Sequence, residues 1–277
     1  MKSDSNKKPD SLKNRIIYGF LGFVLVLGGI LGNAWTYFFV FFVICLFCMH
    51  EYYGLLIRSG KQPSRSYGIV VGISIYCLSF LVSNHMISST YYLWIYPVFS
   101  ALFVLKLYDK HEKQPFENMG LTLLGIIYIA VPFSTLNMAV FIQGVYSYQV
   151  ILGTFFLIWI HDIGAYFVGI RYGKRRLFER ISPNKTWEGS FGGAFLTAVM
   201  VGLVAYYFRD LALWQWAVIG GIVVVVGTYG DLIESMLKRS IQVKDSSGAI
   251  PGHGGFLDRF DNLLLSAPFI AAFLKIF

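Results

Sequence analysis

The chain has 277 residues, of which 56% are hydrophobic and 14% charged, and its formal net charge is +8. With a mean hydropathy of +0.60, this composition excludes an ordinary soluble globular protein. The three cysteines all lie in apolar stretches, so no disulfide framework is expected.

Apolar segments follow one another along nearly the whole chain, after a polar, basic tail at 1–15. They lie near 16–32, 34–56, 67–83, 91–107, 119–142, 150–170, 190–208, 214–232 and 260–277. Each is close to the ~17–25 residues that a helix needs to cross a bilayer. The sequence therefore predicts an all-α, polytopic integral membrane protein with about nine transmembrane helices, forming a single transmembrane domain over 16–277.

The basic residues are distributed unevenly between the two ends of these segments. If the N-terminus is cytoplasmic, 21 of the 23 Lys and Arg residues fall on the cytoplasmic side, and only Arg209 and Lys275 do not. This asymmetry follows the positive-inside rule and predicts an external C-terminus. The net charge is thus first a topology signal and second an attraction for anionic lipid or nucleotide, and nucleic acid is not an expected partner.

His50 and Glu51 are polar residues at the inner end of the second apolar segment. Ionisable residues at membrane depth are costly, and this makes them candidates for a functional role. Pairing between helices explains them equally well, so the sequence leaves both interpretations open.

A first charged segment, 161–189, follows the sixth apolar segment. Asp162 has long apolar runs on both sides, which favours substrate positioning, metal support or pairing with a structural base. Lys185 precedes a predicted helix start at Thr186, where free N–H groups and an ammonium together favour an anion. The basic residues between Arg171 and Arg176 are interpreted mainly as topology charges.

A second charged segment, 230–262, combines carboxylates, bases and glycines between two apolar segments. Its acidic residues are Asp231, Glu234, Asp245, Asp258 and Asp261, and its bases are Lys238, Arg239, Lys244 and Arg259. Asp231, Glu234, Ser235 and Lys238 have the spacing of one helix face, as do Asp258 and Asp261.

These residue types indicate chemistry on phosphate groups. Carboxylates from two helix ends, Asp231 and Asp258, can hold one hard cation and leave positions open for substrate phosphates. The turn at 251–255 contains three glycines, which let backbone N–H groups approach an anion. Acidic ligands, bases and exposed N–H groups together favour phosphoryl or nucleotidyl transfer.

Both charged segments resemble those of phosphatidate cytidylyltransferases, also called CDP-diacylglycerol synthases. The matching residues of the second segment are Ser235-Met236-Leu237-Lys238-Arg239, Lys244-Asp245 and His253-Gly254-Gly255-Phe256-Leu257-Asp258-Arg259-Phe260-Asp261. Those of the first are Asp162, Gly164, Ala165, Tyr166, Ser182, Pro183, Lys185, Thr186, Glu188 and Gly189. Asn184 and Ile163 depart from the family pattern, and the first 150 residues match in hydropathy alone.

The resemblance implies an integral membrane enzyme that joins CTP to phosphatidic acid, giving CDP-diacylglycerol and pyrophosphate at the cytoplasmic face of a bacterial-type inner membrane. It implies Mg²⁺, with Mn²⁺ as a substitute and room for a second cation, and it is compatible with a homodimer surrounded by membrane lipid. The expected catalytic residues are Asp231, Asp258, Asp261 and Lys185, the three aspartates as metal ligands. The expected substrate-binding residues are Asp162, Ser182, Lys238, Arg239, Lys244, Asp245, His253, Gly254, Gly255 and Arg259.

Three alternatives stand beside this interpretation. A CTP-dependent enzyme that acts on an isoprenoid lipid would carry the same motif. A CDP-alcohol phosphotransferase would use the product, but its own sequence pattern is absent. A polytopic transporter is the non-enzymatic alternative; transport sites lie near the bilayer midplane, whereas most carboxylates here cluster at one face.

Overall fold

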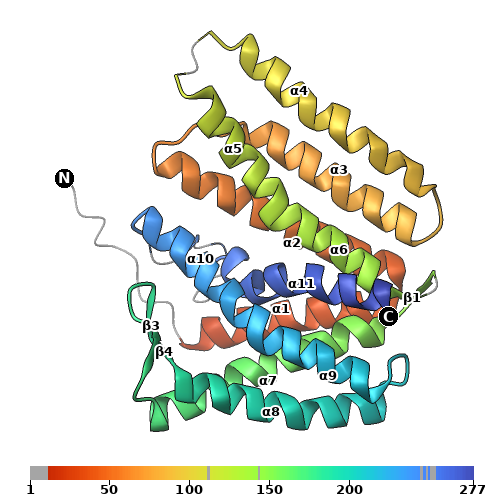
Figure 1. Ribbon diagram of the computed structural model, residues 1–277, viewed down its shortest axis with the longest axis vertical. Helices are drawn as coiled ribbons and strands as arrows, with labels where there is room; N and C mark the ends of the chain where they lie inside the picture. The colour runs from red at the N-terminus through yellow and green to blue at the C-terminus, as the bar shows by residue number, and fades with distance from the viewer. Residues whose placement is uncertain (1–11, 111–112, 143, 244–245, 248, 250–253) are drawn as a thin grey trace.

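The computed structural model describes residues 12–110, 113–142, 144–243, 246–247, 249 and 254–277, with side chains from residue 17 onward. Short connections join helices that run back and forth along the molecule (Figure 1). The first helices are α1 (Leu12–Gly32), α2 (Ala34–Arg58), α3 (Arg65–Ser83), the 3₁₀ helix η1 (Ser89–Trp94) and α4 (Ile95–Leu107). Next come α5 (Pro115–Gly125), the π-helical turn η2 (Ile126–Ala130), α6 (Val131–Val140) and α7 (Tyr148–Tyr172). The last are α8 (Trp187–Tyr207), α9 (Leu213–Ile222), the π-helical turn η3 (Val223–Gly227), α10 (Thr228–Ser240) and α11 (Leu257–Ile276).

Within the described residues, each of the nine predicted apolar segments falls on a helix or a continuous run of helical elements. Seven of these are long and apolar enough to cross a membrane, and Ile17–Gly32 is a shorter apolar helix. The last helix, α11, begins with Asp258, Arg259 and Asp261, which lower its hydropathy. The all-α polytopic membrane fold is thus confirmed. Two segments differ in their bounds. The helical run that matches 119–142 begins at Pro115 and ends at Val140, before a strand, and the run that matches 214–232 continues to Ser240, because the charged turns after Asp231 remain helical.

Two small antiparallel hairpins interrupt the helices, and the sequence did not indicate either. Strands β1 (Phe141–Ile142) and β2 (Val145–Tyr146) connect α6 to α7. Strands β3 (Arg176–Phe178) and β4 (Ser182–Thr186) connect α7 to α8. In Figure 1 the hairpin β3–β4 lies at the left end of the helices and the C-terminus at the right end.

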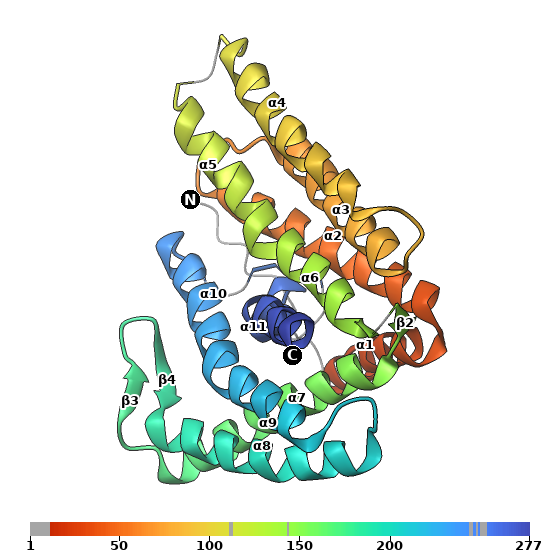
Figure 2. The same ribbon diagram turned by 45° about the vertical axis from the view of Figure 1, so that its right-hand side comes forward.

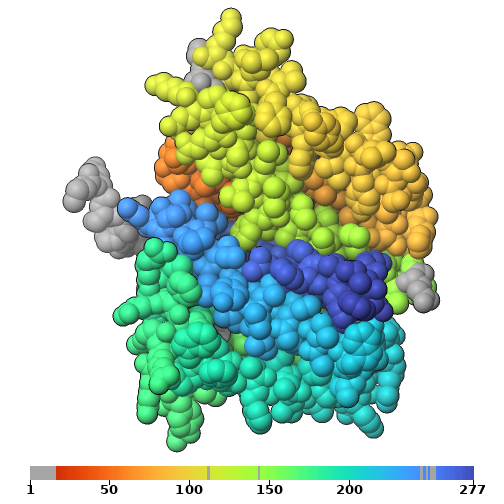
Figure 3. All heavy atoms as spheres, viewed as in Figure 1, coloured from red at the N-terminus to blue at the C-terminus, as the bar shows by residue number. Residues whose placement is uncertain are grey.

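Helix α11 lies in the middle of the molecule and is seen almost end-on in Figure 2, among α10, α6 and α7. Phe260 fixes its first turns, because the ring packs against Phe41 of α2, Phe133 of α6 and Phe155 of α7. Such aromatic contacts add to the packing of buried apolar area. The space-filling view shows α10 and α11 as a blue band between α3–α6 on one side and α8 on the other (Figure 3).

A buried polar network joins the N-terminal helices. Asn137 of α6 accepts a hydrogen bond from the Tyr37 hydroxyl (3.0 Å) and donates to Ser79 Oγ (2.7 Å) and to the carbonyl of Tyr76 (3.1 Å). Interhelical hydrogen bonds of this kind hold membrane helices together where burial of apolar surface cannot. The network therefore fixes α2, α3 and α6 as a frame on which α11 rests.

Candidate active site

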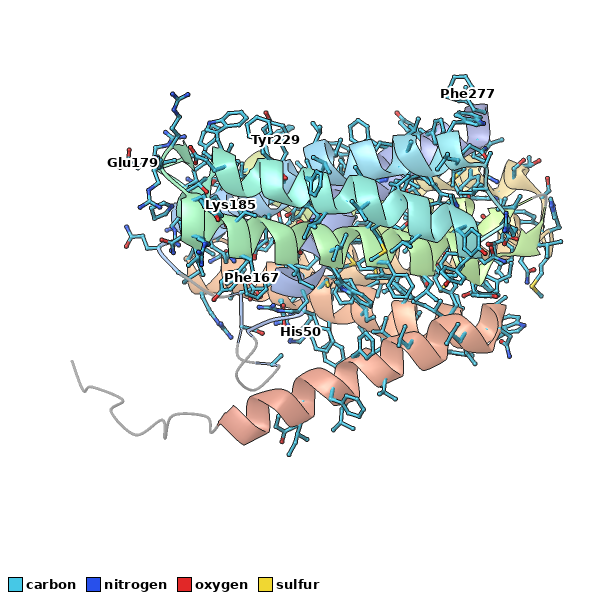
Figure 4. The ribbon with its side chains drawn as sticks, turned by 90° about the horizontal axis from the view of Figure 1, so that it is seen from below. His50, Phe167, Glu179, Lys185, Tyr229 and Phe277 are labelled. Atoms are coloured by element: carbon cyan, nitrogen blue, oxygen red, sulfur yellow. The ribbon has the colours of Figure 1, made fainter. Side chains whose placement is uncertain are left out.

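A pocket of about 680 Å³ opens between α7, the hairpin β3–β4, α8 and α10. Its polar and charged lining residues are His161, Asp162, Arg176, Asn184, Lys185, Thr186, Ser190, Thr228, Asp231 and Asn262. Figure 4 shows Lys185 near one end of the helices, on the same side as Glu179, with Phe277 at the opposite end. The pocket thus joins the two charged segments at the end of the molecule that carries most of the basic residues.

Glycines let α7 and α8 approach each other closely below the pocket. A side chain at Gly164 would lie 3.0 Å from the Gly193 Cα, and one at Gly189 would lie 2.7 Å from the carbonyl oxygen of Ala165. Gly189 and Gly193 are four residues apart on α8, a spacing of small residues that is common where membrane helices pack. This close packing sets Asp162 and Tyr166 of α7 along the wall of the pocket.

The start of α8 fixes the hairpin that carries Lys185. Thr186 caps the helix by accepting a hydrogen bond from the Gly189 N–H (3.2 Å). Glu188 in the first turn accepts hydrogen bonds from the backbone N–H groups of Lys174 (3.0 Å) and Arg175 (3.1 Å). A carboxylate in a first helical turn also interacts favourably with the helix dipole. These contacts explain why Thr186 and Glu188 accompany Lys185 in the sequence.

Lys185 and Asp231 form an ion pair inside the pocket, between β4 and α10. Their side chains keep 27% and 36% of their surface accessible, so an entering ligand can reach both. Asp162 and Asp261 lie near enough to interact electrostatically with this pair. Asp162 and Asp261 thus place two further carboxyl groups near this ion pair, while Arg176 in the pocket wall and Arg259 near Asp162 supply further positive charge.

Asp258 lies in a different cluster from Asp231. Its Oδ1 accepts a hydrogen bond from Lys238 Nζ (2.7 Å), and its Oδ2 accepts bonds from Ser246 Oγ (2.9 Å) and the Gly255 N–H (2.8 Å). Lys238 pairs in addition with Glu234, whose side chain is only 1% exposed. Neither Asp258 nor Asp261 lines the described pocket, but Asp261 interacts electrostatically with Asp231, Lys185 and Asp162. The structure thus brings together Asp162, Lys185, Asp231 and Asp261, and separates Asp258 from the pocket wall.

The remaining predicted residues lie around these two clusters. Ser182 is half-buried in β4, and Arg239 is exposed at the end of α10, with Nη1 donating to the carbonyl of Val243 (3.4 Å). Arg259 is exposed on the first turn of α11. Gly254 and Gly255 precede α11, whereas Lys244, Asp245 and His253 lie outside the described residues.

Sequence reasoning gave no site role to several polar residues of the pocket wall, which are His161, Arg176, Asn184, Thr186, Ser190, Thr228 and Asn262. Arg176 was interpreted as a topology charge, since four bases lie close together and nothing local distinguishes one of them. Thr228 lies three residues before Asp231, so helical spacing extended backwards from Asp231 would have found it. Its Oγ1 lies 3.2 Å from His161 Nε2 and joins α10 to α7.

The donor set of the pocket suits a hard cation only if a ligand supplies further oxygens. Among the described residues, no group of three or more His, Cys, Asp or Glu side chains is arranged to hold a metal ion by itself. Mg²⁺ is commonly bound through one or two carboxylates together with water and substrate phosphates. Asp231 and its neighbours Asp162 and Asp261 fit that pattern.

The helices and this pocket define a polytopic membrane protein with a charged site at one end of its helical bundle. The chain belongs to the cytidylyltransferase family, whose model matches residues 13–277. It is 37% identical over 183 residues to a phosphatidate cytidylyltransferase of Haemophilus influenzae, which covers 62% of this chain and 64% of the relative. It is 38% and 36% identical over 172 residues to those of Staphylococcus saprophyticus and Staphylococcus aureus, covering 61% of this chain and 64% of each relative. The matched region thus spans less than two thirds of these curated relatives.

Proposed function

We propose that the protein is a phosphatidate cytidylyltransferase, which transfers the cytidylyl group of CTP to phosphatidic acid and releases pyrophosphate. The observation that carries this proposal is the accessible Lys185–Asp231 ion pair in a pocket where two additional carboxylates lie nearby. An ammonium and acidic metal ligands are what transfer of a phosphate-linked group requires. The names of the relatives support the same reaction.

In the proposed reaction, a phosphate oxygen of phosphatidic acid attacks the α-phosphorus of CTP. A new P–O bond forms there, the bond to the bridging oxygen of pyrophosphate breaks, and the electron pair leaves with pyrophosphate. The attacking phosphate is already an anion, so no side chain has to remove a proton. Lys185 and Arg176, which both line the pocket, would stabilise the charge on the phosphoryl oxygens.

Asp231 is the first candidate to hold Mg²⁺, with Asp261 and Asp162 as its neighbours. Bound there, Mg²⁺ would offset the charge of the CTP phosphates. Lys185 would then exchange its contact with Asp231 for a phosphate oxygen, because the ion pair is accessible rather than sealed in the protein. Asp258, which sequence reasoning grouped with Asp231, would act on the site through the position of α11.

The lipid substrate would reach the pocket from the side. Tyr166 and Ile170 of α7 line it and are 63% and 70% exposed. In a membrane protein such apolar side chains face lipid, so the acyl chains of phosphatidic acid would remain in the bilayer beside them. Only the headgroup would need to enter the charged part of the pocket.

The function is tested with the purified full-length protein in detergent, supplied with labelled CTP, phosphatidic acid and Mg²⁺. We expect labelled CDP-diacylglycerol and pyrophosphate in equal amounts. A chelator should abolish product formation, because without a divalent cation the carboxylates would repel the negatively charged CTP phosphates, and Mg²⁺ or Mn²⁺ should restore it. Pyrophosphate release that does not require phosphatidic acid would contradict the proposed transfer.

We also propose that the pocket faces the cytoplasm, where CTP is found. The supporting observations are the positive-inside distribution of bases and the position of Lys185 and Phe277 at opposite ends of the molecule (Figure 4). A tag before residue 12 should be protected from reagents added outside intact cells, whereas a tag after Phe277 should be labelled. Labelling of both tags from the same side would overturn the odd number of membrane spans.

A further inference from the structure

Glu51 of α2 is a buried carboxylate that holds the chain just before α11. Its side chain comes from the N-terminal half of the protein, and the residue is only 6% exposed. Oε1 accepts hydrogen bonds from Ser247 Oγ (2.6 Å) and the Phe256 N–H (3.0 Å). Oε2 accepts them from Ser246 Oγ (3.0 Å) and the Leu257 N–H (2.9 Å). Four donors from a distant part of the sequence thus converge on one carboxylate.

The chemistry of these contacts requires a carboxylate. Phe256 is the N-cap residue of α11 and Leu257 is its first residue. Backbone N–H groups at a helix start have no partner within the helix, and Glu51 supplies one from another helix. The negative charge also lies at the positive end of the α11 dipole. Each oxygen receives one backbone N–H and one hydroxyl. An amide in place of the carboxylate would therefore point its own N–H groups at a fixed backbone donor.

A second contact on the same face of α2 supports the same segment. Phe47 lies four residues before Glu51, so the two side chains are neighbours on the helix surface. The Phe47 ring stacks on Phe256, with centroids 4.8 Å apart and planes 10° from parallel. Helix α2 therefore holds the start of α11 through the Phe47 ring and the Glu51 carboxylate.

The glycine pair before α11 is explained by this contact. A side chain at Gly255 would occupy the space of Glu51 Oε2 and Ser246 Oγ. Gly254 has a φ of +83°, a conformation that side chains disfavour, and a Cβ there would lie 2.8 Å from Asp258 Oδ2. In this structure the two glycines make room for the protein's own carboxylates.

We propose that Glu51 is a positioning residue for the transfer reaction. It fixes the first turn of α11, which carries Asp258 and Asp261, and so sets Asp261 relative to Lys185 and Asp231. Ser246 joins Glu51 to Asp258: its Oγ lies 3.0 Å from Glu51 Oε2 and 2.9 Å from Asp258 Oδ2, so its single hydroxyl proton can serve either carboxylate. Its backbone N–H also donates to Asp258 Oδ2 (3.1 Å). This inference rests on the proposed function for its catalytic consequence, whereas the contact itself is independent of it.

The test compares Glu51→Gln with Glu117→Gln in the full-length protein. Glu117 makes an ion pair with Lys61 in which both side chains are more than 40% exposed, so the same chemical change there should have little effect. Two properties are measured: the rate of tryptic cleavage between α10 and α11 without substrate, and the steady-state constants for CTP and phosphatidic acid. Glu51→Asp, which keeps both anionic oxygens, serves as the conservative variant.

For Glu51→Gln we expect tryptic cleavage at least ~10-fold faster than in the wild type, because the loss of these hydrogen bonds to Ser246, Ser247 and the start of α11 makes local opening more frequent. We expect kcat ~10- to 100-fold lower, since small misplacements of reacting groups have effects of this size. The KM for phosphatidic acid should stay near the wild-type value, Glu51→Asp should lie in between, and Glu117→Gln should match the wild type. If Glu51→Gln fails to accumulate, Ser247→Ala takes its place. This variant removes one of the hydrogen bonds to Glu51, and the same measurements should show smaller changes.

Two results for Glu51→Gln would overturn the positioning role. One is faster tryptic cleavage with an unchanged kcat, and the other is a reduced kcat with an unchanged rate of cleavage. If the wild type forms no CDP-diacylglycerol, the proposed function fails together with the catalytic consequence. In that case the tryptic comparison still decides whether Glu51 holds the start of α11, and equal cleavage of Glu51→Gln and wild type refutes that contact.

Discussion

Asp231→Asn should reduce the formation of CDP-diacylglycerol by at least ~100-fold, which corresponds to about 2.7 kcal/mol in the activation barrier. The amide keeps the shape of the side chain but removes the negative charge that pairs with Lys185 and that a hard cation requires. Because the Asp231 side chain is 36% exposed, the folded protein should tolerate the change. Steady-state assays at saturating Mg²⁺ measure the activity, and thermal unfolding of the same sample measures the stability.

Lys185→Ala provides the companion experiment. If Lys185 and Asp231 act as a unit, the double variant should be scarcely less active than either single variant. Asp210→Asn is a matched control, because Asp210 is an exposed aspartate that accepts a hydrogen bond from Ser147 (2.6 Å), far from the pocket lining. Retention of more than roughly a tenth of the activity by Asp231→Asn, a loss below ~1.4 kcal/mol, would remove Asp231 from the reaction.

The positions of the helices along the chain could be predicted, because they depend on signals that are local in the sequence. Apolar segments of bilayer length indicate the spans, and the bases indicate which ends share a side. The same signals predicted that Lys185 and Asp231 lie at one end of the helices, and the pocket contains both, together with Asp162. The hairpin β3–β4 was not predicted, because Pro183, Asn184 and Lys185 are not residues typical of strands.

The separation of Asp231 from Asp258 could not be predicted from spacing. Residues three apart on a helix differ by about 60° in direction, so Asp231 and Glu234 share a broad face without facing the same neighbour. In the structure Asp231 faces Lys185 of β4, whereas Glu234 meets Lys238, which also binds Asp258 of α11. The rotation of α10 decides which carboxylate lines the pocket, and tertiary packing sets that rotation. The role of Glu51 depends in the same way on partners about 200 residues away in the sequence.

Asp258→Asn is expected to act mainly on stability. The variant distinguishes a structural role of Asp258 in positioning α11 from a role as a direct metal ligand. Asp258, Lys238 and Glu234 form a buried charged cluster, with side chains only 7%, 13% and 1% exposed. The amide would lose the ion pair with Lys238 or turn its N–H groups toward the Ser246 and Gly255 donors. Breaking one partner of a buried ion pair costs ~3–5 kcal/mol, and we expect the lower end because Glu234 still pairs with Lys238.

The measurement is thermal unfolding in detergent, combined with the dependence of activity on Mg²⁺ concentration. Asp258→Asn should unfold at a clearly lower temperature than wild type, and its remaining activity should require no more Mg²⁺ than the wild type. Asp231→Asn is the comparison, with wild-type unfolding and almost no activity. If Asp258→Asn instead unfolds like the wild type and regains activity at high Mg²⁺, then Asp258 ligates the metal directly. Its contacts with Lys238, Ser246 and Gly255 would then describe the enzyme before the metal and CTP bind.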